Sequence, residues 1–355
     1  MNPAFPSRPR TVQLDPVARR ALCADQRRIV IVGASGWIGK SLLAGILSAL
    51  GEGAMRERVV CFGSTARDIA LNRDVSVPQL PLDRLSCIKP APTILFHLAF
   101  LTKDKVAGMD EADYVEANSW LSDTVLGALD KIGVDRVFVA SSGAAARAED
   151  AGAARDLRVY GRMKCADEAA FARWAREGEG RRAMIVRIFS LAGPFINKFE
   201  TYALASFILD ALAERPIRVT APRPVVRSYV AVRELLSLAL IQQLSDHRQA
   251  AVTQLDSGGD ALELGEVAAL VGALFSVPVE RAEIRDPAAN NYAGAREQYD
   301  GLLQHYGIAP VTLADAIVET AAFIASLDIH GSGGAGKSVL SGVRTRPETA
   351  VIGVK

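Results

Sequence analysis

Short apolar runs alternate with stretches of helical periodicity through the first half of the chain. Apolar runs of strand length lie at 28–33, 58–62, 93–100, 136–141 and 183–189. Segments with helical spacing of apolar residues fall between several of these runs, at 38–50, 113–132 and 160–176. Strands that alternate with helices predict an α/β fold whose parallel sheet is covered on both faces. We therefore expect a doubly wound (Rossmann) domain over residues 27–194, with later returns to it at about 226–255.

The pattern changes after Gly193-Pro194, where the regular alternation stops. Helical segments follow at 201–213, 233–244, 262–275 and 312–327. They predict a smaller, mostly substrate-binding lobe over residues 195–328, at the carboxyl-terminal edge of the sheet. Residues 1–26 contain four prolines among arginines and predict a flexible or peripheral extension. The glycine-rich residues 329–355 predict a mobile tail.

Composition narrows the class of protein. Half of the 355 residues are apolar, which is enough for a large core. The formal net charge of +1 gives no reason to expect nucleic acid or an anionic membrane as a partner. No apolar stretch reaches the ~18–20 residues that span a bilayer, and no secretory signal is expected. The four scattered cysteines are expected to be reduced thiols, which fits a cytoplasmic protein. The cysteines and histidines show no metal-ligand spacing, and we expect no metal site.

The first apolar run ends in a glycine-rich turn, which reads Gly33-Ala34-Ser35-Gly36-Trp37-Ile38-Gly39. Glycine at the first position allows a tight turn with positive φ, the second lets a pyrophosphate approach the backbone, and the third lets the helix pack closely. The N-terminus of the following helix offers free N–H groups to phosphates. This turn predicts a dinucleotide site; the alternative is a glycine-rich turn without a ligand. Trp37 either shields the pyrophosphate or packs on a neighbouring loop.

The end of the second predicted strand bears on the choice of dinucleotide. NAD is usually bound there by a carboxylate that accepts hydrogen bonds from the ribose. This chain has Gly63-Ser64-Thr65-Ala66-Arg67 instead. Hydroxyls and a guanidinium suit the 2′-phosphate of NADP, with Ser64 and Arg67 as the contacts. The alternative is that Arg67 pairs with Asp68 or another acid, and NAD remains the second candidate.

A candidate catalytic set of three residues lies beyond the two cofactor motifs. Tyr160 and Lys164 lie four residues apart, so they share one face of a helix. We expect the ammonium to lower the pKa of the phenol and also to bind the nicotinamide ribose. Ser142, at the end of the fourth apolar run, is the candidate for orienting a substrate oxygen, with Ser141 as the alternative.

Together these motifs resemble those of an extended short-chain dehydrogenase/reductase, in the branch that includes nucleotide-sugar epimerases, dehydratases and reductases. The resemblance covers about residues 28–327. It is carried by Gly33–Gly39, Phe96-His97-Leu98-Ala99, Asn118, Ser141-Ser142, Tyr160–Lys164, Arg187–Pro194 and Arg227-Ser228-Tyr229-Val230. It implies Ser142, Tyr160 and Lys164 as the catalytic set.

The resemblance also implies further contacts. Leu98 and Ala99 would line the nicotinamide half of the cofactor site, and Arg227 would contact the diphosphate of a nucleotide sugar. Ser190 replaces an asparagine that often touches that diphosphate, and Phe100 replaces a small residue and narrows the pocket. The helices at 113–132 and 160–176 correspond to those that pair across family dimers, so a homodimer is expected.

The residues beside Ser142 separate the possible reactions. Dehydratases of this family follow the serine or threonine with an Asp-Glu pair, whereas this chain has Gly143-Ala144. This argues against dehydration and leaves a reductase or an epimerase. Epimerases of this branch usually keep the acidic ribose ligand of NAD, which is missing after Phe62. We therefore expect an NADP(H)-dependent reductase of a carbonyl, on a nucleotide-diphosphate keto-deoxysugar. The first alternative is a nucleotide-sugar epimerase that retains NAD. The second is a non-catalytic NADP-binding sensor.

Two other basic features stay open on the sequence alone. Three arginines, Arg215, Arg218 and Arg223, either assist Arg227 at the diphosphate or are ordinary solvated surface residues. Residues 331–338 match the P-loop pattern, but no strand precedes them and no acidic magnesium-binding strand follows. We expect that match to be a chance feature of the tail.

Overall fold

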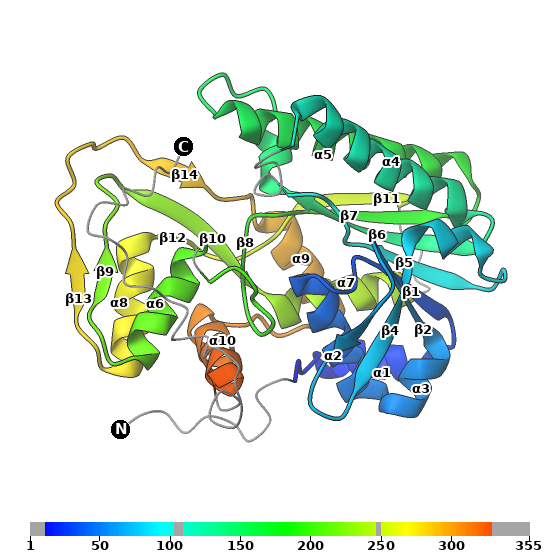
Figure 1. Ribbon diagram of the computed structural model, residues 1–355, viewed down its shortest axis with the longest axis horizontal. Helices are drawn as coiled ribbons and strands as arrows, with labels where there is room; N and C mark the ends of the chain where they lie inside the picture. Colours follow the sequence, from blue (N-terminus) through cyan, green and yellow to red (C-terminus); the bar gives the residue numbers. More distant parts are fainter. Residues whose placement is uncertain (1–10, 103–108, 200, 246–249, 329–355) are drawn as a thin grey trace.

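The computed structural model describes residues 11–102, 109–199, 201–245 and 250–328, and the P-loop-like segment lies outside these residues (Figure 1). An eight-stranded sheet runs in the order β11-β7-β6-β5-β1-β2-β4-β3, and all neighbours pair in parallel except β3 with β4. The predicted α/β fold with a doubly wound sheet is confirmed. The strands are β1 (Arg28–Val32), β2 (Val59–Gly63), β3 (Arg67–Ala70), β4 (Ser76–Pro81), β5 (Thr93–His97), β6 (Val134–Ser142), β7 (Arg182–Ile188) and β11 (Val252–Asp256).

The central strand β1 shows how the sheet is buried on both faces. Successive side chains of a strand point to opposite faces. Ile29 and Ile31 enter one core cluster with the helices on one face, and Val30 and Val32 enter another with the helices on the opposite face. Both layers are seen in Figure 1. The covering helices are α2 (Trp37–Leu50), α3 (Glu52–Arg58), α7 (Val232–Leu244) and α9 (Glu297–Tyr306) on one side, and α4 (Glu111–Leu129) and α5 (Arg155–Glu177) on the other, with the 3-10 turns η1 (Leu82–Cys87) and η3 (Gly143–Arg147).

A smaller lobe lies at the carboxyl-terminal edge of the sheet. Its core joins α6, α8 and α10, so the last described helix returns to pack with segments far earlier in the chain. Of the residues expected to return to the main domain, β11 pairs with β7 in the central sheet, whereas β10 belongs to the sheet of the lobe. The elements of the lobe are β8 (Ser190–Ala192), α6 (Ala203–Leu212), β9 (Ile217–Val219), β10 (Val225–Ala231), β12 (Ala261–Glu263), α8 (Leu264–Phe275), β13 (Val279–Arg281), β14 (Asn290–Tyr292) and α10 (Leu313–Asp328).

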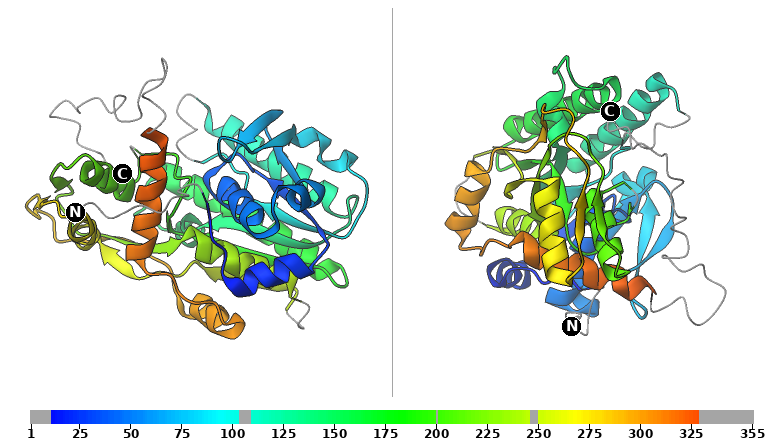
Figure 2. Two further views of the ribbon diagram at one scale, coloured as in Figure 1. Left: turned by 90° about the horizontal axis from the view of Figure 1, so that it is seen from below. Right: turned by 90° about the vertical axis from the view of Figure 1, so that its left-hand side faces the viewer.

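Residues 11–26, expected as a flexible or peripheral extension, are folded onto the surface of the main domain, so the flexible alternative does not hold for them. Asp15 caps a helix, α1 (Pro16–Ala24), by accepting a hydrogen bond from the N–H of Val17 at 2.8 Å. The helix lies against α7 and α2 (Figure 2), and Ala18 and Leu22 are fully buried in the core cluster of the main domain. The prolines and arginines of this segment favoured an interpretation as an extension. The short amphipathic helix was not recognised, because only its packing partners show which face is covered.

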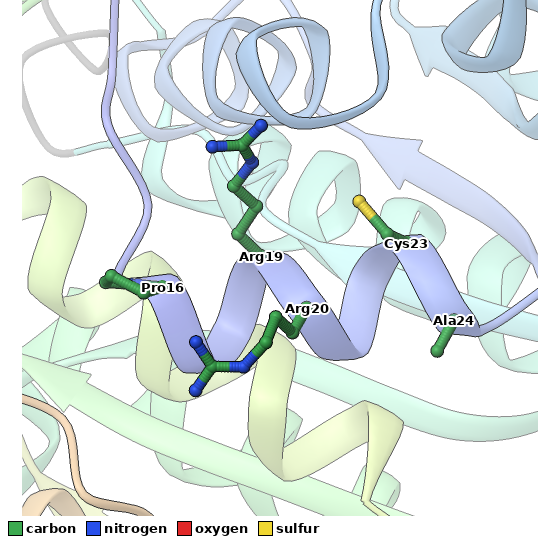
Figure 3. Close-up of a pocket in the computed structure, with 5 residues that line it drawn as sticks. All are labelled: Pro16, Arg19, Arg20, Cys23 and Ala24. Carbon is green, nitrogen blue, oxygen red and sulfur yellow. The ribbon is translucent and has the colours of Figure 1, made fainter.

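The outer face of α1 carries a shallow depression. It is lined by Pro16, Arg19, Arg20, Cys23 and Ala24, all from this one helix (Figure 3). The side chains of Arg19 and Arg20 are exposed and point to different sides of the helix. None of the predicted site residues lines this depression, so it is not a candidate for the catalytic chemistry.

Leu22→Ala tests whether α1 belongs to the folded core. The substitution deletes buried methyl groups and leaves a cavity, so we expect the free energy of unfolding to fall by about 2–5 kcal/mol, measured by urea denaturation. Arg20→Ala, on the exposed face of the same helix, should change it by less than about 0.5 kcal/mol. Equal effects of the two substitutions would contradict the packing of α1 described above.

Candidate active site

The glycine-rich turn between β1 and α2 is built so that only glycine fits at two positions. Gly33 has a φ of +90°, and a Cβ there would lie 2.6 Å from the backbone nitrogen of Ala99. A Cβ on Gly39 would lie 2.5 Å from the carbonyl oxygen of Gly33. The turn therefore presses directly against the residues that follow β5. This contact brings the predicted cofactor residues Leu98 and Ala99 beside the turn.

The start of α2 has the features of a phosphate site. Gly36 is the residue that precedes the helix, and no side chain caps it. The N–H groups of Trp37, Ile38 and Gly39 therefore have no acceptor within the helix. Fourteen residues of helix add the partial positive charge of the helix dipole at this point. These donors and the uncapped backbone fit the pyrophosphate of a dinucleotide, with Ser35 at the adjoining position of the turn.

The side chain of Trp37 packs on a neighbouring loop, which is the second of the two interpretations considered from the sequence. Its indole nitrogen donates a hydrogen bond to the carbonyl oxygen of Pro194 at 2.7 Å, and Ser41 donates to the same oxygen at 3.1 Å. The indole also lies 5.5 Å from the ring of Tyr202. Trp37 thus ties α2 to the first segment of the smaller lobe and offers the cofactor only its backbone N–H.

The end of β2 presents polar groups at the surface. Ser64, Thr65 and Arg67 are exposed, and the guanidinium of Arg67 donates to the Thr65 hydroxyl at 2.9 Å. Within the part of the chain that the structure describes, no carboxylate pairs with Arg67. The alternative that Asp68 neutralises this arginine is therefore not what the structure has, and the guanidinium is open to an anion.

A close approach of α5 to the end of β6 brings the catalytic candidates together. Tyr160 and Lys164 lie inside α5, and Ser142 is the last residue of β6. A Cβ on Gly161 would lie 2.3 Å from the carbonyl oxygen of Ala144, so only glycine allows the helix to lie this near to the turn. The close packing at Gly161 therefore holds the neighbouring residue, Tyr160, next to Ser142.

The structure distinguishes Ser142 from Ser141. Ser141 is buried and donates a hydrogen bond to Glu168, which also binds Arg187 and Gln254. Its hydroxyl is thus part of a structural network. Ser142 lies on the other side of the strand, where its hydroxyl faces two phenols. Of the two serines, Ser142 is the one that points into the candidate site.

The second phenol near Ser142 belongs to Tyr292, which sequence reasoning missed. The hydroxyls of Ser142 and Tyr292 lie 3.2 Å apart, although the two residues are 150 positions apart in the chain. Tyr292 lies on β14, and its ring packs at a tilt against that of Phe189, with 4.9 Å between the ring centroids. The short strand Asn290–Tyr292 carries no periodic pattern or motif, so no local signal identifies this residue.

The protonation state of Tyr160 differs from the expectation. Burial raises the pKa of this phenol, and only the nearby Ser142 hydroxyl acts in the opposite direction. Burial therefore outweighs the lowering of the pKa that was expected from Lys164. Burial thus favours the protonated form of this phenol.

Lys164 is buried and held by three kinds of contact. Its Nζ donates to the carbonyl oxygen of Ala140 at 2.9 Å and lies 3.6 Å from the centroid of the Phe100 ring. Burial lowers the pKa of Lys164 to about 8, and the charges of Asp167 and Glu168 oppose this shift. Phe100 also meets the ring of Tyr160 edge-on at 5.7 Å. The bulky residue at position 100 thus fills the space around the ammonium and the phenol.

Arg227 is the cation that the smaller lobe contributes. Its Nη1 donates to the carbonyl oxygens of Val226 and Asn290 at 2.8 and 2.9 Å, and burial lowers its pKa. No carboxylate pairs with it among the described residues. Ser190 lies on β8, which pairs with the same strand, β10, that carries Arg227. The predicted substrate residues are therefore on adjacent strands.

The other three arginines considered for the diphosphate are neutralised at the surface. Arg215 pairs with Asp210, Arg218 with Glu280 and Arg223 with Asp286, at 2.8, 2.9 and 2.9 Å. All three are well exposed. The interpretation as solvated surface residues is therefore the one that the structure supports.

Within the described ranges, no group of three or more His, Cys, Asp or Glu side chains is arranged to hold a metal ion. No helix there has the length and the apolar character needed to cross a membrane. His97, which ends an apolar run, is buried and lies against Asp167 rather than in a cluster of histidines.

The sequence matches the NAD dependent epimerase/dehydratase family over residues 29–253, which is more than half of the chain. The chain belongs to this family. No curated protein matches it.

Solved structures share the fold. A UDP-glucose 4-epimerase from Thermotoga maritima, solved with UDP-glucose, is 19% identical with a TM-score of 0.61, covering 84% of this chain and 99% of that one. A UDP-N-acetylglucosamine 4-epimerase from Methanobrevibacter ruminantium is 15% identical with a TM-score of 0.63, covering 84% and 98%. An NAD-dependent NDP-hexosamine 5,6-dehydratase of tunicamycin biosynthesis is 18% identical with a TM-score of 0.63, covering 85% and 99%. At these identities the likeness concerns the fold.

Gly39→Ala tests the turn as the dinucleotide site. Because the new Cβ would collide with the Gly33 carbonyl, the turn must shift, and we expect the affinity for NADPH or NADH to fall at least tenfold, measured by nucleotide fluorescence. Gly53→Ala, in α3, is the matched control, since nothing lies within 4 Å of its added Cβ. Unchanged affinity in a folded Gly39→Ala protein would contradict this site.

Proposed function

We propose that this protein is an NADP(H)-dependent reductase of a carbonyl group, with a nucleotide-diphosphate keto-deoxysugar as its substrate. The observation that carries the proposal is the placement of a protonated Tyr160 beside Ser142, at the sheet edge that also holds the glycine-rich turn. A bound nicotinamide dinucleotide would supply the hydride for the carbonyl carbon. The chain itself has to supply a proton, an orientation and an anion site.

Tyr160 is suited to donate the proton. Its phenol is kept in the acid form by burial, and a developing alkoxide on the substrate is a strong enough base to take that proton. Ser142 orients the substrate oxygen through its hydroxyl, which already lies within hydrogen-bond distance of another phenol, that of Tyr292. Once Tyr160 has lost its proton, the nearby Lys164 ammonium stabilises the phenolate.

Reduction fits the site better than dehydration. Expulsion of water needs a second acid–base pair beside the serine, and those positions are Gly143 and Ala144. A Cβ on Gly143 would lie 2.5 Å from the ring of Phe189, and Ala144 is fully buried. Packing therefore leaves no room for a side chain at Gly143, and a carboxylate at the position of Ala144 would be buried away from water. An epimerase retains its NAD, and the end of β2 lacks the carboxylate that usually binds the NAD ribose.

The substrate class rests on Arg227. A half-buried guanidinium without a carboxylate partner is suited to an anion, and a diphosphate can accept two hydrogen bonds from it. Arg147 lies across β14 from it, with its Nη1 3.4 Å from the carbonyl oxygen of Asn291, although Asp150 pairs with this second arginine. Support also comes from structures of the same fold solved with UDP-glucose and with UDP-glucuronic acid.

The preference for NADP rests on the end of β2. Arg67 is exposed, free of carboxylate partners in the described chain and flanked by Ser64 and Thr65, a set that matches a 2′-phosphate. Several structures of the same fold contain NAD, so the preference has to come from this chain's own residues. The missing carboxylate after Phe62 is the feature that separates this site from an NAD site.

The expected homodimer has a suitable surface. Trp120 of α4 is 55% exposed, which is unusual for so large an apolar side chain. Helices α4 and α5 lie side by side along one face of the molecule (Figure 1). An exposed tryptophan on a helical face is typical of an interface, and we propose that a second copy of the chain covers it.

Tyr160→Phe tests the mechanism. The substitution keeps the ring and removes the proton, so we expect kcat for NADPH-dependent reduction of nucleotide-diphosphate keto-deoxysugars to fall about 10²–10⁴-fold, with NADPH affinity retained. The assay follows NADPH absorbance with a panel of keto-sugar and simple carbonyl substrates. Tyr306→Phe, which removes a phenol that binds Gln242 in α7, should keep its turnover.

Three outcomes would contradict the proposal. Full turnover in Tyr160→Phe would remove the proton donor from the mechanism. Purification with bound NAD, together with interconversion of nucleotide sugars without added cofactor, would identify the epimerase instead. Tight NADPH binding with no oxidation of NADPH across the whole panel would favour the non-catalytic sensor.

Arg67→Ala tests the choice of cofactor. Loss of a charged hydrogen bond to a phosphate costs about 1.5–3 kcal/mol, so the Kd for NADPH should rise about 10–100-fold while the Kd for NADH stays constant. Arg56→Ala, which removes a surface arginine paired with Glu52, should change neither. Equal loss of both cofactors, or a wild-type preference for NADH, would contradict the assignment of NADP.

A further inference from the structure

A buried carboxylate lies below the catalytic candidates on the same helix. Asp167 of α5 accepts a hydrogen bond through Oδ1 from the Ser122 hydroxyl of α4 at 2.7 Å. Its Oδ2 lies 3.5 Å from Nε2 of His97 at the end of β5 and 3.9 Å from Nζ of Lys164. The side chains of His97, Lys164 and Asp167 are at most 3% exposed. One carboxylate is thus shared by groups from three elements.

Asp167 is the charge that balances the buried ammonium of Lys164. An ammonium removed from water needs a compensating charge, because otherwise it loses its proton. The second carboxylate near it, Glu168, is already engaged by Arg187, which binds it through two hydrogen bonds, and by Ser141. In the described chain no carboxylate other than Asp167 lies within ion-pair distance of Lys164.

The neighbours of Asp167 keep it ionised. Burial alone would raise the pKa of Asp167, but the contacts with His97, Lys164 and Ser122 outweigh burial and lower it to about 2. The ring of Phe171 stacks on His97 with 4.9 Å between centroids and holds the imidazole in this position. The carboxylate is therefore charged and fixed at every pH at which Lys164 titrates.

We propose that Asp167, held by Ser122 and His97, is a positioning residue that keeps the Lys164 ammonium charged and in place behind Tyr160. It touches neither the phenol nor the turn that binds the cofactor, and it acts through Lys164. The inference about its role in turnover rests on the proposed function. Its effect on the charge of Lys164 does not.

The groups around Lys164 determine in which direction its pKa moves when Asp167 is neutralised. These are the Ala140 carbonyl of β6, the Phe100 ring after β5, and the Asp167 and Glu168 carboxylates of α5. The ammonium is lost as the pH rises through about 8, the pKa of Lys164. Removing the negative charge of Asp167 moves this loss to lower pH, because the desolvated ammonium then has less compensation.

The test is a titration of Lys164 by NMR in the full chain without cofactor or substrate. Lysine is labelled with ¹³C at Cε, and the Lys164 resonance is assigned by its absence in Lys164→Met. In the wild type we expect a transition near pH 8, and in Asp167→Asn a transition at least about one unit lower, a tenfold loss of proton affinity. Asp123→Asn, an exposed aspartate of α4, is the matched control and should leave the transition in place.

A second variant covers the case in which Asp167→Asn does not fold. Ser122→Ala removes only the hydrogen bond that holds Asp167, so the Lys164 transition should move to lower pH by less than in Asp167→Asn. An unchanged Lys164 transition in whichever of these variants folds would overturn the proposal.

Turnover gives the second readout. In Asp167→Asn the alkaline limb of the pH profile of kcat should move to lower pH by the same number of units as the NMR transition. Tyr160→Phe should lose turnover at every pH. If the NMR transition moves but Tyr160→Phe remains active, the proposed reaction is wrong and the charge compensation stands. If the NMR transition stays in place while Tyr160→Phe is inactive, the reaction stands and the role of Asp167 is wrong.

Discussion

Parallel pairing of β1, β5 and β6 is the constraint on which the rest of the molecule depends. Val32 pairs with His97, and His97 pairs with Val139, so the carboxyl ends of the three strands meet at one edge of the sheet. The glycine-rich turn follows β1 and Ser142 ends β6, which extends three residues beyond Val139. Ligand sites in open parallel sheets lie at this edge for the same reason. A shift of register would separate these groups even with every residue unchanged.

Burial then decides the chemistry of the groups gathered there. The same apolar surroundings raise the pKa of Tyr160 and lower that of Lys164, so the phenol tends to keep its proton and the amine tends to lose one. Packing also excludes a carboxylate beside Ser142, because Phe189 leaves no space for a side chain at Gly143. The reaction proposed here is the one that needs a proton donor and no second carboxylate.

The strands and helices of the main domain were predictable because their burial is continuous. A parallel strand covered on both faces, such as β1, is apolar at nearly every position, and this signal is visible without partners. Short elements gave no such signal. α1 was taken for part of an extension, and the antiparallel edge strand β3 has one buried residue, Ile69.

The sequence alone determined the fold class and the identity of Gly33, Ser142, Tyr160 and Lys164 as candidates, since each follows a regular element at a spacing that the backbone dictates. Tertiary structure decided what surrounds them. It brought Tyr292 to Ser142 from a strand of another lobe, turned Lys164 toward Asp167 and Ala140, and left Arg227 without a carboxylate among the described residues. Protonation states and partners depend on desolvation and on contacts between distant segments, and neither quantity is local in the chain.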